Sequence, residues 1–320
     1  MSIINHRKVF FVLSAVLVLG SIFAMLTLGL NFGIDFKGGS SLEVSYAEAR
    51  LPQEIVKANL DKLGLGGYVL TPSGNLNYVL KTRDITPAEK TTILKALSKP
   101  ASAFSRTESA SSETKSAQGY GMAKEEQFNT LGPVVGTQLK NKALLAIAIV
   151  IICIVLFITF AFRKVSYPVA SWKYGLATII ALAHDVIIPT GVFILWTSDF
   201  HKGHVGQIDL LFVTALLAIL GYSVHDTIVV FDRVRENLHL GARLPNEGFE
   251  QTVGKSVTQT FGRSINTSLT IFLALAALYF IGGESTRDFA FVLLVGVIVG
   301  TYSSIFVASP LLVTLEKMQK

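Results

Sequence analysis

Six long apolar runs constrain the fold of this chain more than any other feature. A helix needs about 20 predominantly apolar residues to cross a bilayer, and six segments approach or exceed that length. Hydrophobic residues make up 51% of the 320 residues and charged residues only 16%, which is not the composition of a soluble domain. The sequence therefore predicts an α-helical membrane protein with six transmembrane helices. The expected spans are Val9–Leu30, Ala143–Phe162, Tyr174–Trp196, Leu210–Phe231, Ile265–Ile281 and Phe289–Leu315.

The distribution of basic residues indicates how these helices are oriented. The net charge is +6, and Lys and Arg are concentrated in the segments that lie inside if the N-terminus is cytoplasmic. The two short outer loops carry only Lys202 and Arg287. This is the positive-inside bias, so we expect both termini to be cytoplasmic. Topology accounts for the basic charge, and no nucleic-acid partner is expected. The first span lacks a small-residue cleavage pattern and is expected to remain as an anchor.

The predicted topology divides the chain into three parts. Residues 1–30 form the N-terminal tail and the first transmembrane helix, and residues 31–141 form one extracytoplasmic domain. Residues 142–320 form transmembrane helices two to six. Within this last part, a cytoplasmic loop over residues 232–264 is expected to contain an amphipathic helix that lies on the membrane.

The outer domain has the pattern of an α+β ferredoxin-like fold. Its elements are expected in the order strand, helix, strand, strand, helix, strand, which is the split βαβ arrangement. The second helix opens with Thr-Pro-Ala-Glu, a typical capping box. The Ser-rich stretch 104–121 is expected to be a loop. The expected elements are Ser40–Tyr46, Pro52–Leu63, Tyr68–Thr71, Leu76–Thr82, Thr86–Lys99 and Glu125–Leu131. The domain contains no catalytic constellation, which favours a binding or lever role.

A single carboxylate, Asp226, is the strongest functional signal in the sequence. It lies six residues before Asp232, where charged residues mark the return to water, and hence roughly 9 Å inside the membrane boundary. A carboxylate inside a bilayer costs about 2.5–3.5 kcal/mol, so a functional role is the default hypothesis. The alternative is a structural role, either in an ion pair or as a protonated acid hydrogen-bonded between helices.

Other polar residues lie within the predicted spans. His184 and Asp185 fall near the middle of the third span, where they are either a second functional pair or a mutually satisfied one. His225 precedes Asp226, but adjacent helical residues point about 100° apart and need not share a face. No metal-ligand cluster and no nucleophile–base motif is present, so neither a metal site nor enzymatic activity is expected.

The start of the fifth span carries a polar stripe. Arg263, Asn266, Thr267 and Thr270 recur at spacings of three and four residues, and therefore lie on one helix face. Donors on this face could satisfy acceptors on the fourth helix. The alternative is ordinary packing by the hydroxyl residues, with the arginine snorkelling to the membrane surface.

Five stretches resemble the SecD/SecF family of bacterial protein-export membrane proteins, in particular its SecF branch. They are FGIDFKGGSSLEV, LGPVVGTQL, GYSVHDTIVVFDRVREN, LPNEGF and RSINTSLT, and they occur in the family's order and spacing. The first contains the family-signature residues Asp35, Gly38 and Gly39. The sequence departs from the family pattern at His225, where Asn is common.

The resemblance implies a function that the residues alone only permit. It implies a subunit that pairs with SecD in a twelve-helix assembly of the resistance-nodulation-division type, located in the bacterial cytoplasmic (inner) membrane. That assembly uses the proton gradient to assist export through the SecYEG channel, with an unfolded polypeptide at the outer domain and a YajC-like subunit as a further partner. The implied site is Asp226 as proton carrier, with Arg263 and Thr267 as its polar partners. Protons are the coupling ion, and no cofactor is implied.

Two alternative functions remain open at this point. The first is a structural scaffold of the translocase, for which Asp226→Asn would be harmless. The second is a half-transporter of the resistance-nodulation-division type that exports small molecules or lipids. The second predicts larger outer domains and two repeats, whereas this chain has one repeat and one outer domain. An intramembrane hydrolase is the least favoured, because no motif for it is present.

Overall fold

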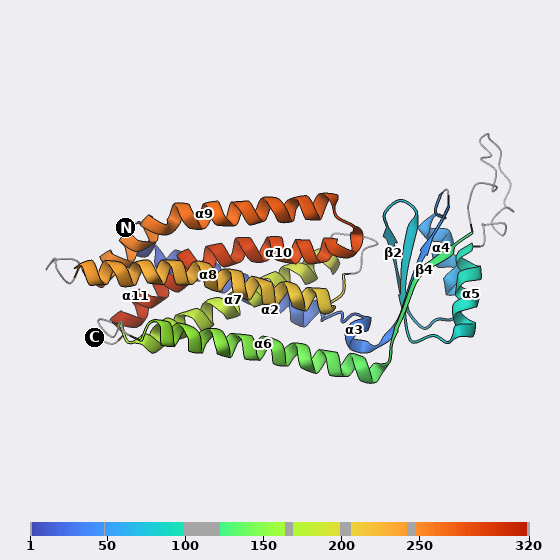
Figure 1. The fold of residues 1–320 in the computed structure, drawn as a ribbon, viewed down its shortest axis with the longest axis horizontal. Helices are drawn as coiled ribbons and strands as arrows, with labels where there is room; N and C mark the ends of the chain where they lie inside the picture. The colour runs from blue at the N-terminus through green and yellow to red at the C-terminus, as the bar shows by residue number, and fades with distance from the viewer. Residues whose placement is uncertain are drawn as a thin grey trace.

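The structure is a computed structural model in which a long helical bundle carries a small mixed domain at one end (Figure 1). Both ends of the chain lie at the end of the bundle farthest from the β-sheet. The residues described are 2–47, 49–98, 122–163, 169–198, 206–241 and 248–318. The predicted loop 104–121 lies outside these residues.

The six predicted transmembrane helices are confirmed. Each expected span coincides with a helix that is long and apolar enough to cross a membrane. The last span is not a regular helix throughout, because a π-helical turn, η1 (Ser304–Ala308), separates two α-helical parts. A short helix α1 (Ser2–Asn5) precedes the bundle. The bundle helices are α2 (Arg7–Leu28), α6 (Pro133–Ala161), α7 (Ser171–Ser198), α8 (Leu210–Gly241), α9 (Phe249–Ile281), α10 (Glu284–Ser303) and α11 (Ser309–Lys317).

The segment expected to be a cytoplasmic loop, residues 232–264, is largely helical. Helix α8 continues to Gly241 and α9 already begins at Phe249, so most of this segment is a helical hairpin. Asn237 donates hydrogen bonds to Ser256 Oγ and Gln259 Oε1, each at 2.8 Å. The amphipathic pattern therefore reflects packing of α8 against α9, and the described residues contain no separate helix for the membrane surface.

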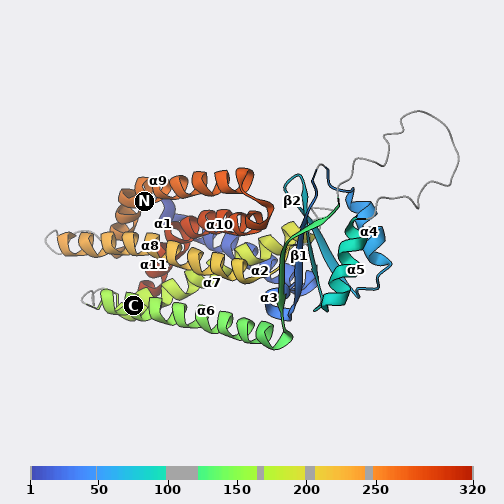
Figure 2. The same cartoon turned by 45° about the vertical axis from the view of Figure 1, so that its right-hand side comes forward.

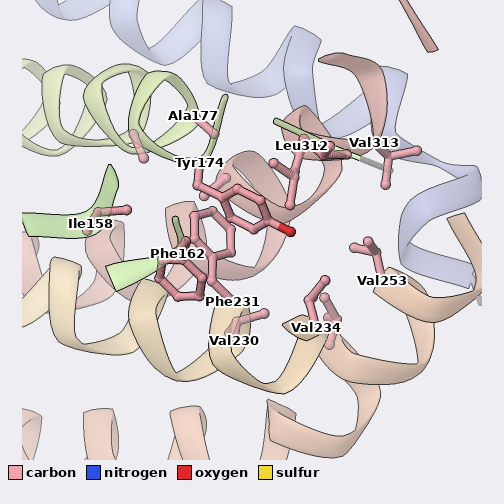
Figure 3. Packing of buried hydrophobic residues seen from close by; sticks show 14 of the residues in the cluster. Ile158, Phe162, Tyr174, Ala177, Val230, Phe231, Val234, Val253, Leu312 and Val313 are labelled. Atoms are coloured by element: carbon pink, nitrogen blue, oxygen red, sulfur yellow. The ribbon is translucent and has the colours of Figure 1, made fainter. Parts of the chain in front are cut away.

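Aromatic packing holds the bundle together near this hairpin (Figure 3). The ring of Tyr174 on α7 stacks on Phe162 with centroids 5.1 Å apart, and its edge meets Phe231 of α8 at 5.3 Å. All three side chains are buried. Such ring pairs add about 0.5–1.5 kcal/mol each to the free energy from burial alone, and they fix α7 against α8.

The outer domain has the predicted ferredoxin-like order of elements. The sheet order is β2-β3-β1-β4, with all neighbours antiparallel. Helices α4 and α5 cover the sheet face that points away from the bundle (Figure 2), where Leu42, Val56 and Leu80 form part of the core. The predicted capping box of α5 is present: Thr86 N donates to Glu89 Oε2 at 2.9 Å, and Glu89 N donates to Thr86 Oγ1 at 3.3 Å. The elements are β1 (Gly39–Ser45), α4 (Gln53–Asp61), β2 (Tyr68–Ser73), β3 (Asn77–Thr82), α5 (Pro87–Ser98) and β4 (Lys124–Leu131).

The outer domain joins the bundle through a close-packed junction that explains the two signature glycines. Gly38 and Gly39 have φ values of +78° and +144°, which side chains rarely adopt. A Cβ on Gly38 would also lie 2.7 Å from Pro133 Cα at the start of α6. A Cβ on Gly136 would lie 2.7 Å from Gly38 N. Only glycine therefore lets the turn before β1 approach α6 this closely.

Candidate functional site

Asp226 lies on the inward face of α8, and its side chain is buried, with 7% exposed. Its Oδ1 accepts a hydrogen bond from Ser264 Oγ of α9 at 2.5 Å. Its Oδ2 accepts one from Ser304 Oγ of η1. Within the described ranges, no Lys or Arg forms an ion pair with this carboxylate. Asp226 is therefore a buried acid held by hydroxyl groups from two other helices.

The π-helical turn provides one of these hydroxyls. It begins at Ser304, whose backbone carbonyl accepts a hydrogen bond from Ser309 Oγ at 2.9 Å. Such a turn inserts one residue into the helix, and short π-turns occur frequently at functional sites. The adjacent residue Ser303 is also fully buried, so two successive serines point into the bundle.

A second buried carboxylate, Asp185 of α7, has a similar environment. It is fully buried, and its Oδ1 is 2.9 Å from Nδ1 of His184. Its Oδ2 accepts hydrogen bonds from Ser223 Oγ of α8 and from Ser303 Oγ of α10, the latter at 2.7 Å. The pair predicted from the sequence is thus satisfied on both carboxylate oxygens by neighbouring helices.

The sequence predicted that Asp226 contacts the polar stripe on α9 that begins at Arg263. Among the described residues this contact is absent. Arg263, Asn266 and Thr267 are all exposed, and none of them bonds to Asp226 in the part of the chain that the structure describes. In the second half of α9 the buried positions are Thr260, Ser264 and Ser268, which are four residues apart. Successive helical residues point about 100° apart, so the residue beside Arg263, not Arg263 itself, faces the acid.

His225 is likewise not part of the buried site. Its side chain is exposed, whereas that of Asp226 is buried. The two residues are adjacent on α8 and therefore point to different sides. The side chain of His225, where the sequence differs from the pattern of the family it resembles, therefore points away from the interior of the bundle.

A chain of hydroxyls continues from this site between α8, α9 and α10. Ser268 Oγ lies 2.5 Å from Tyr222 Oη and 2.6 Å from Thr301 Oγ1. Ser268 and Thr301 also line a mostly apolar cavity of about 300 Å³ between α9 and α10. The serines and this network were not identified from the sequence, because hydroxyl residues are common in packed membrane helices and give little signal.

The signature residue Asp35 contacts the helix that carries Asp226. It lies on the short helix α3 (Ile34–Lys37), and its Oδ2 accepts a hydrogen bond from the backbone N of Leu210, the first residue of α8. The distance between these atoms is 3.0 Å. The same first turn is also capped by Asp209, the residue before Leu210, whose Oδ1 accepts from Phe212 N at 2.9 Å. A carboxylate at a helix N-terminus satisfies free backbone donors and is favoured by the helix dipole.

The described residues contain no group of His, Cys, Asp or Glu that could hold a metal ion. What the site can do is take up and release protons, because its central groups are two buried carboxylates and an imidazole. Both carboxylates are contacted by adjacent residues of one helix, Ser303 and Ser304.

Comparison with known proteins shows the family. The model of the protein export membrane protein SecD/SecF, C-terminal, matches residues 111–318, and that of the SecD/SecF GG motif matches residues 23–49. The Protein translocase subunit SecF of Thermobaculum terrenum is 38% identical over 316 residues, which are 98% of this chain and 93% of the relative. The SecF of Anaerolinea thermophila is 35% identical over 99% of this chain and 94% of the relative.

Solved structures agree with this assignment. The crystal structure of SecDF from Thermus thermophilus, a translocon-associated membrane protein, matches 99% of this chain with a TM-score of 0.77 and 29% identity. This chain spans only 39% of that SecDF chain. SecDF in its super-membrane-facing form matches with a TM-score of 0.62 and 30% identity. The chain therefore belongs to the SecD/SecF family of protein-export membrane proteins, and within it to the SecF group of protein translocase subunits.

Proposed function

We propose that this chain couples proton movement to protein export, with Asp226 as the proton-carrying group and protons as the coupling ion. The observation that carries the proposal is a buried carboxylate held by two serine hydroxyls from two other helices, without a basic partner among the described residues. A buried charge without a partner of opposite sign is costly, so a carboxylate in this position is a candidate for a functional role. The proposal assigns no catalytic step and no cofactor.

Protonation changes the hydrogen bonds that hold α8 in place. The ionised carboxylate only accepts, and Ser264 and Ser304 both donate to it. The protonated acid gains an O–H donor, so one serine must turn and accept, or move away. A proton that crosses the whole potential releases about 2.3 kcal/mol per 100 mV, which biases a two-state equilibrium roughly fifty-fold.

We propose that this change reaches the outer domain along α8. The helix begins at Leu210, where Asp35 caps it, and Asp35 belongs to the segment that leads into β1. Two backbone hydrogen bonds tie the same segment to Ile208: Gly33 N donates to Ile208 O at 2.9 Å, and Ile208 N donates to Asn31 O at 2.8 Å. A shift of α8 would therefore move the domain that contacts the exported polypeptide.

The exposed stripe on α9 supports a proposal for the position of the partner subunit. An arginine facing lipid costs about 2.5–3.5 kcal/mol, and Arg263 and Thr267 are exposed on this chain. We propose that SecD covers the stripe, and that the complex acts with the SecYEG channel and a YajC-like subunit in the bacterial cytoplasmic membrane. A cysteine at Thr267 should then crosslink to SecD, whereas one at Val12, exposed on α2, should not.

The decisive variant is Asp226→Asn, which keeps the size and polarity of the side chain but does not titrate. Membrane vesicles that carry the variant with SecD should assemble the complex but lose the gradient-dependent part of export. The matched control is Asp232→Asn, an exposed carboxylate about 1.7 turns further along α8. If Asp226→Asn exports normally under a proton gradient, Asp226 is structural and the scaffold hypothesis is favoured.

A further inference from the structure

We propose that His184 and Asp185 form a second proton-binding site, in which Nε2 of His184 takes up the proton, and that this site is linked to Asp226 through Ser303 and Ser304. The proposal rests on the proposed function only in its link to Asp226. The pair lies in the interior of the bundle, on a different helix from Asp226.

The imidazole has one satisfied and one unsatisfied nitrogen. Nδ1 of His184 lies 2.9 Å from Asp185 Oδ1. Ser223 and Ser303 both donate to Oδ2 of the same acid, which favours the ionised carboxylate. An ionised carboxylate only accepts, and we therefore assign the hydrogen to Nδ1. Nε2 is buried and has no hydrogen-bond partner in the described structure, and only 5% of the side chain is exposed. In the neutral ring, Nε2 therefore holds a free lone pair inside the bundle, and buried polar atoms are rarely left in this state without a functional reason.

A proton on this atom changes the net charge of the pair. With a neutral imidazole, the pair carries the single negative charge of Asp185, which is fully buried. A proton on Nε2 gives an imidazolium beside a carboxylate, and the pair becomes neutral overall. The ring of Tyr302 stacks on His184 with centroids 6.0 Å apart, which places an aromatic face where it stabilises a cation.

The surrounding helices bring few other titratable groups to the pair. Tyr302 of α10 is engaged, because its Oη donates to Phe10 O and accepts from Ser14 Oγ of α2. On α8, Asp226 is held by other serines and His225 is exposed. The charged residues of the remaining neighbours lie in the outer turns of the helices: Arg7 and Lys8 on α2, Lys140 and Lys142 on α6, Glu316 and Lys317 on α11. On α10 itself, Arg287 and Asp288 lie near its start, and the thiol of Cys153, further along α6, is exposed.

Adjacent hydroxyls connect the two acids. Ser303 donates to Asp185 and Ser304 donates to Asp226, and the two serines are joined by one peptide bond at the start of the π-turn. Helix α8 makes a second connection, because Ser223 also donates to Asp185 and lies three residues before Asp226. A change of protonation that moves either serine therefore alters the other acid, and the coupling must be reciprocal.

Nitrogen-15 NMR of the histidine rings tests this in the purified complex with SecD. We expect the ring of His184 to titrate at Nε2. Its signal is assigned by its loss in His184→Asn. Asparagine keeps a polar group near the Nδ1 position and removes Nε2. If that variant does not assemble, His184→Gln provides the assignment. In Asp226→Asn, the titration midpoint of His184 should shift by about half a pH unit, or threefold in proton affinity. In the control Asp232→Asn it should not.

Each outcome decides a separate part of the proposal. If Nε2 of His184 keeps one protonation state over the pH range in which the complex is folded, the second site is refuted. This result would leave the export test of Asp226 untouched. If His184 titrates but its midpoint is the same in Asp226→Asn as in the wild type, the link through Ser303 and Ser304 is refuted.

Discussion

The junction between the outer domain and α8 gives a prediction that can be worked out in magnitude. Asp35→Ala removes the carboxylate that accepts from Leu210 N, while Asp209 still accepts from Phe212 N. Asp35 is not the N-cap residue itself, but it satisfies a free backbone donor as an N-cap does, and loss of such a contact costs typically about 1 kcal/mol, which is a factor of about five in a local opening equilibrium. The amide of Leu210 should therefore exchange with solvent about five times faster.

Residue-resolved hydrogen exchange of the purified complex measures this effect. The amide of Phe212 is an internal control, because its acceptor remains, and Asp209→Ala should reverse the pattern. Asp35→Asn should lie close to the wild type, since asparagine caps helices as well as aspartate does. If Leu210 exchanges at the wild-type rate in Asp35→Ala, or if both amides accelerate equally, the cap does not hold α8 at this point. In that case the proposed path from Asp226 to the outer domain loses its support.

Three further predictions concern the outer domain. Gly38→Ala should destabilise the chain by about 1–3 kcal/mol and lower its melting temperature, because the position has positive φ and no room for a Cβ. The hydrogen bond from Arg83, together with that from Thr86 N, lowers the pKa of Glu89 to about 2. The cap contribution of Glu89 is therefore present above its ordinary pKa and lost as the pH falls toward 2. In Arg83→Gln, carboxyl carbon-13 NMR should show the Glu89 midpoint moving back up. With Cys153 replaced, a cysteine at exposed Lys62 should be labelled only from outside; labelling only from the cytoplasmic side would refute the topology.

The fold was predictable from the sequence wherever a long apolar run or a capping motif determines the local structure. The six apolar runs require helices in a bilayer, and the capping box at Thr86 marks the start of α5. The hairpin of α8 and α9 was not predicted, because an amphipathic helix that packs on another helix has the same pattern as one that lies on lipid. These two kinds of amphipathic helix can be distinguished only once the neighbouring helix is placed. Here the hydrogen bond from Asn237 on α8 to Ser256 on α9 shows that the helices pack on each other.

The sequence identified the buried acids of the site but not the residues that form hydrogen bonds with them. Asp226 and Asp185 stand out because carboxylates are rare and costly inside a membrane, and both prove to be buried. The residues that hold them are serines, which occur throughout packed membrane helices, and sequence spacing favoured Arg263 over the neighbouring Ser264. The π-helical turn at Ser304 inserts one residue into the helix, and the hydrophobic periodicity of the sequence does not reveal this insertion. The partners of a buried acid thus depend on helix rotation, which tertiary packing sets.

If Asp226 carries the proton, the reconstituted complex should conduct protons through this residue. Liposomes that contain this chain with SecD and an enclosed pH-sensitive dye are given an imposed proton gradient. We predict flux above that of empty liposomes for the wild type and for Asp232→Asn, and flux no greater than that of empty liposomes for Asp226→Asn. If the complex with Asp226→Asn conducts protons at the wild-type rate, the account is contradicted.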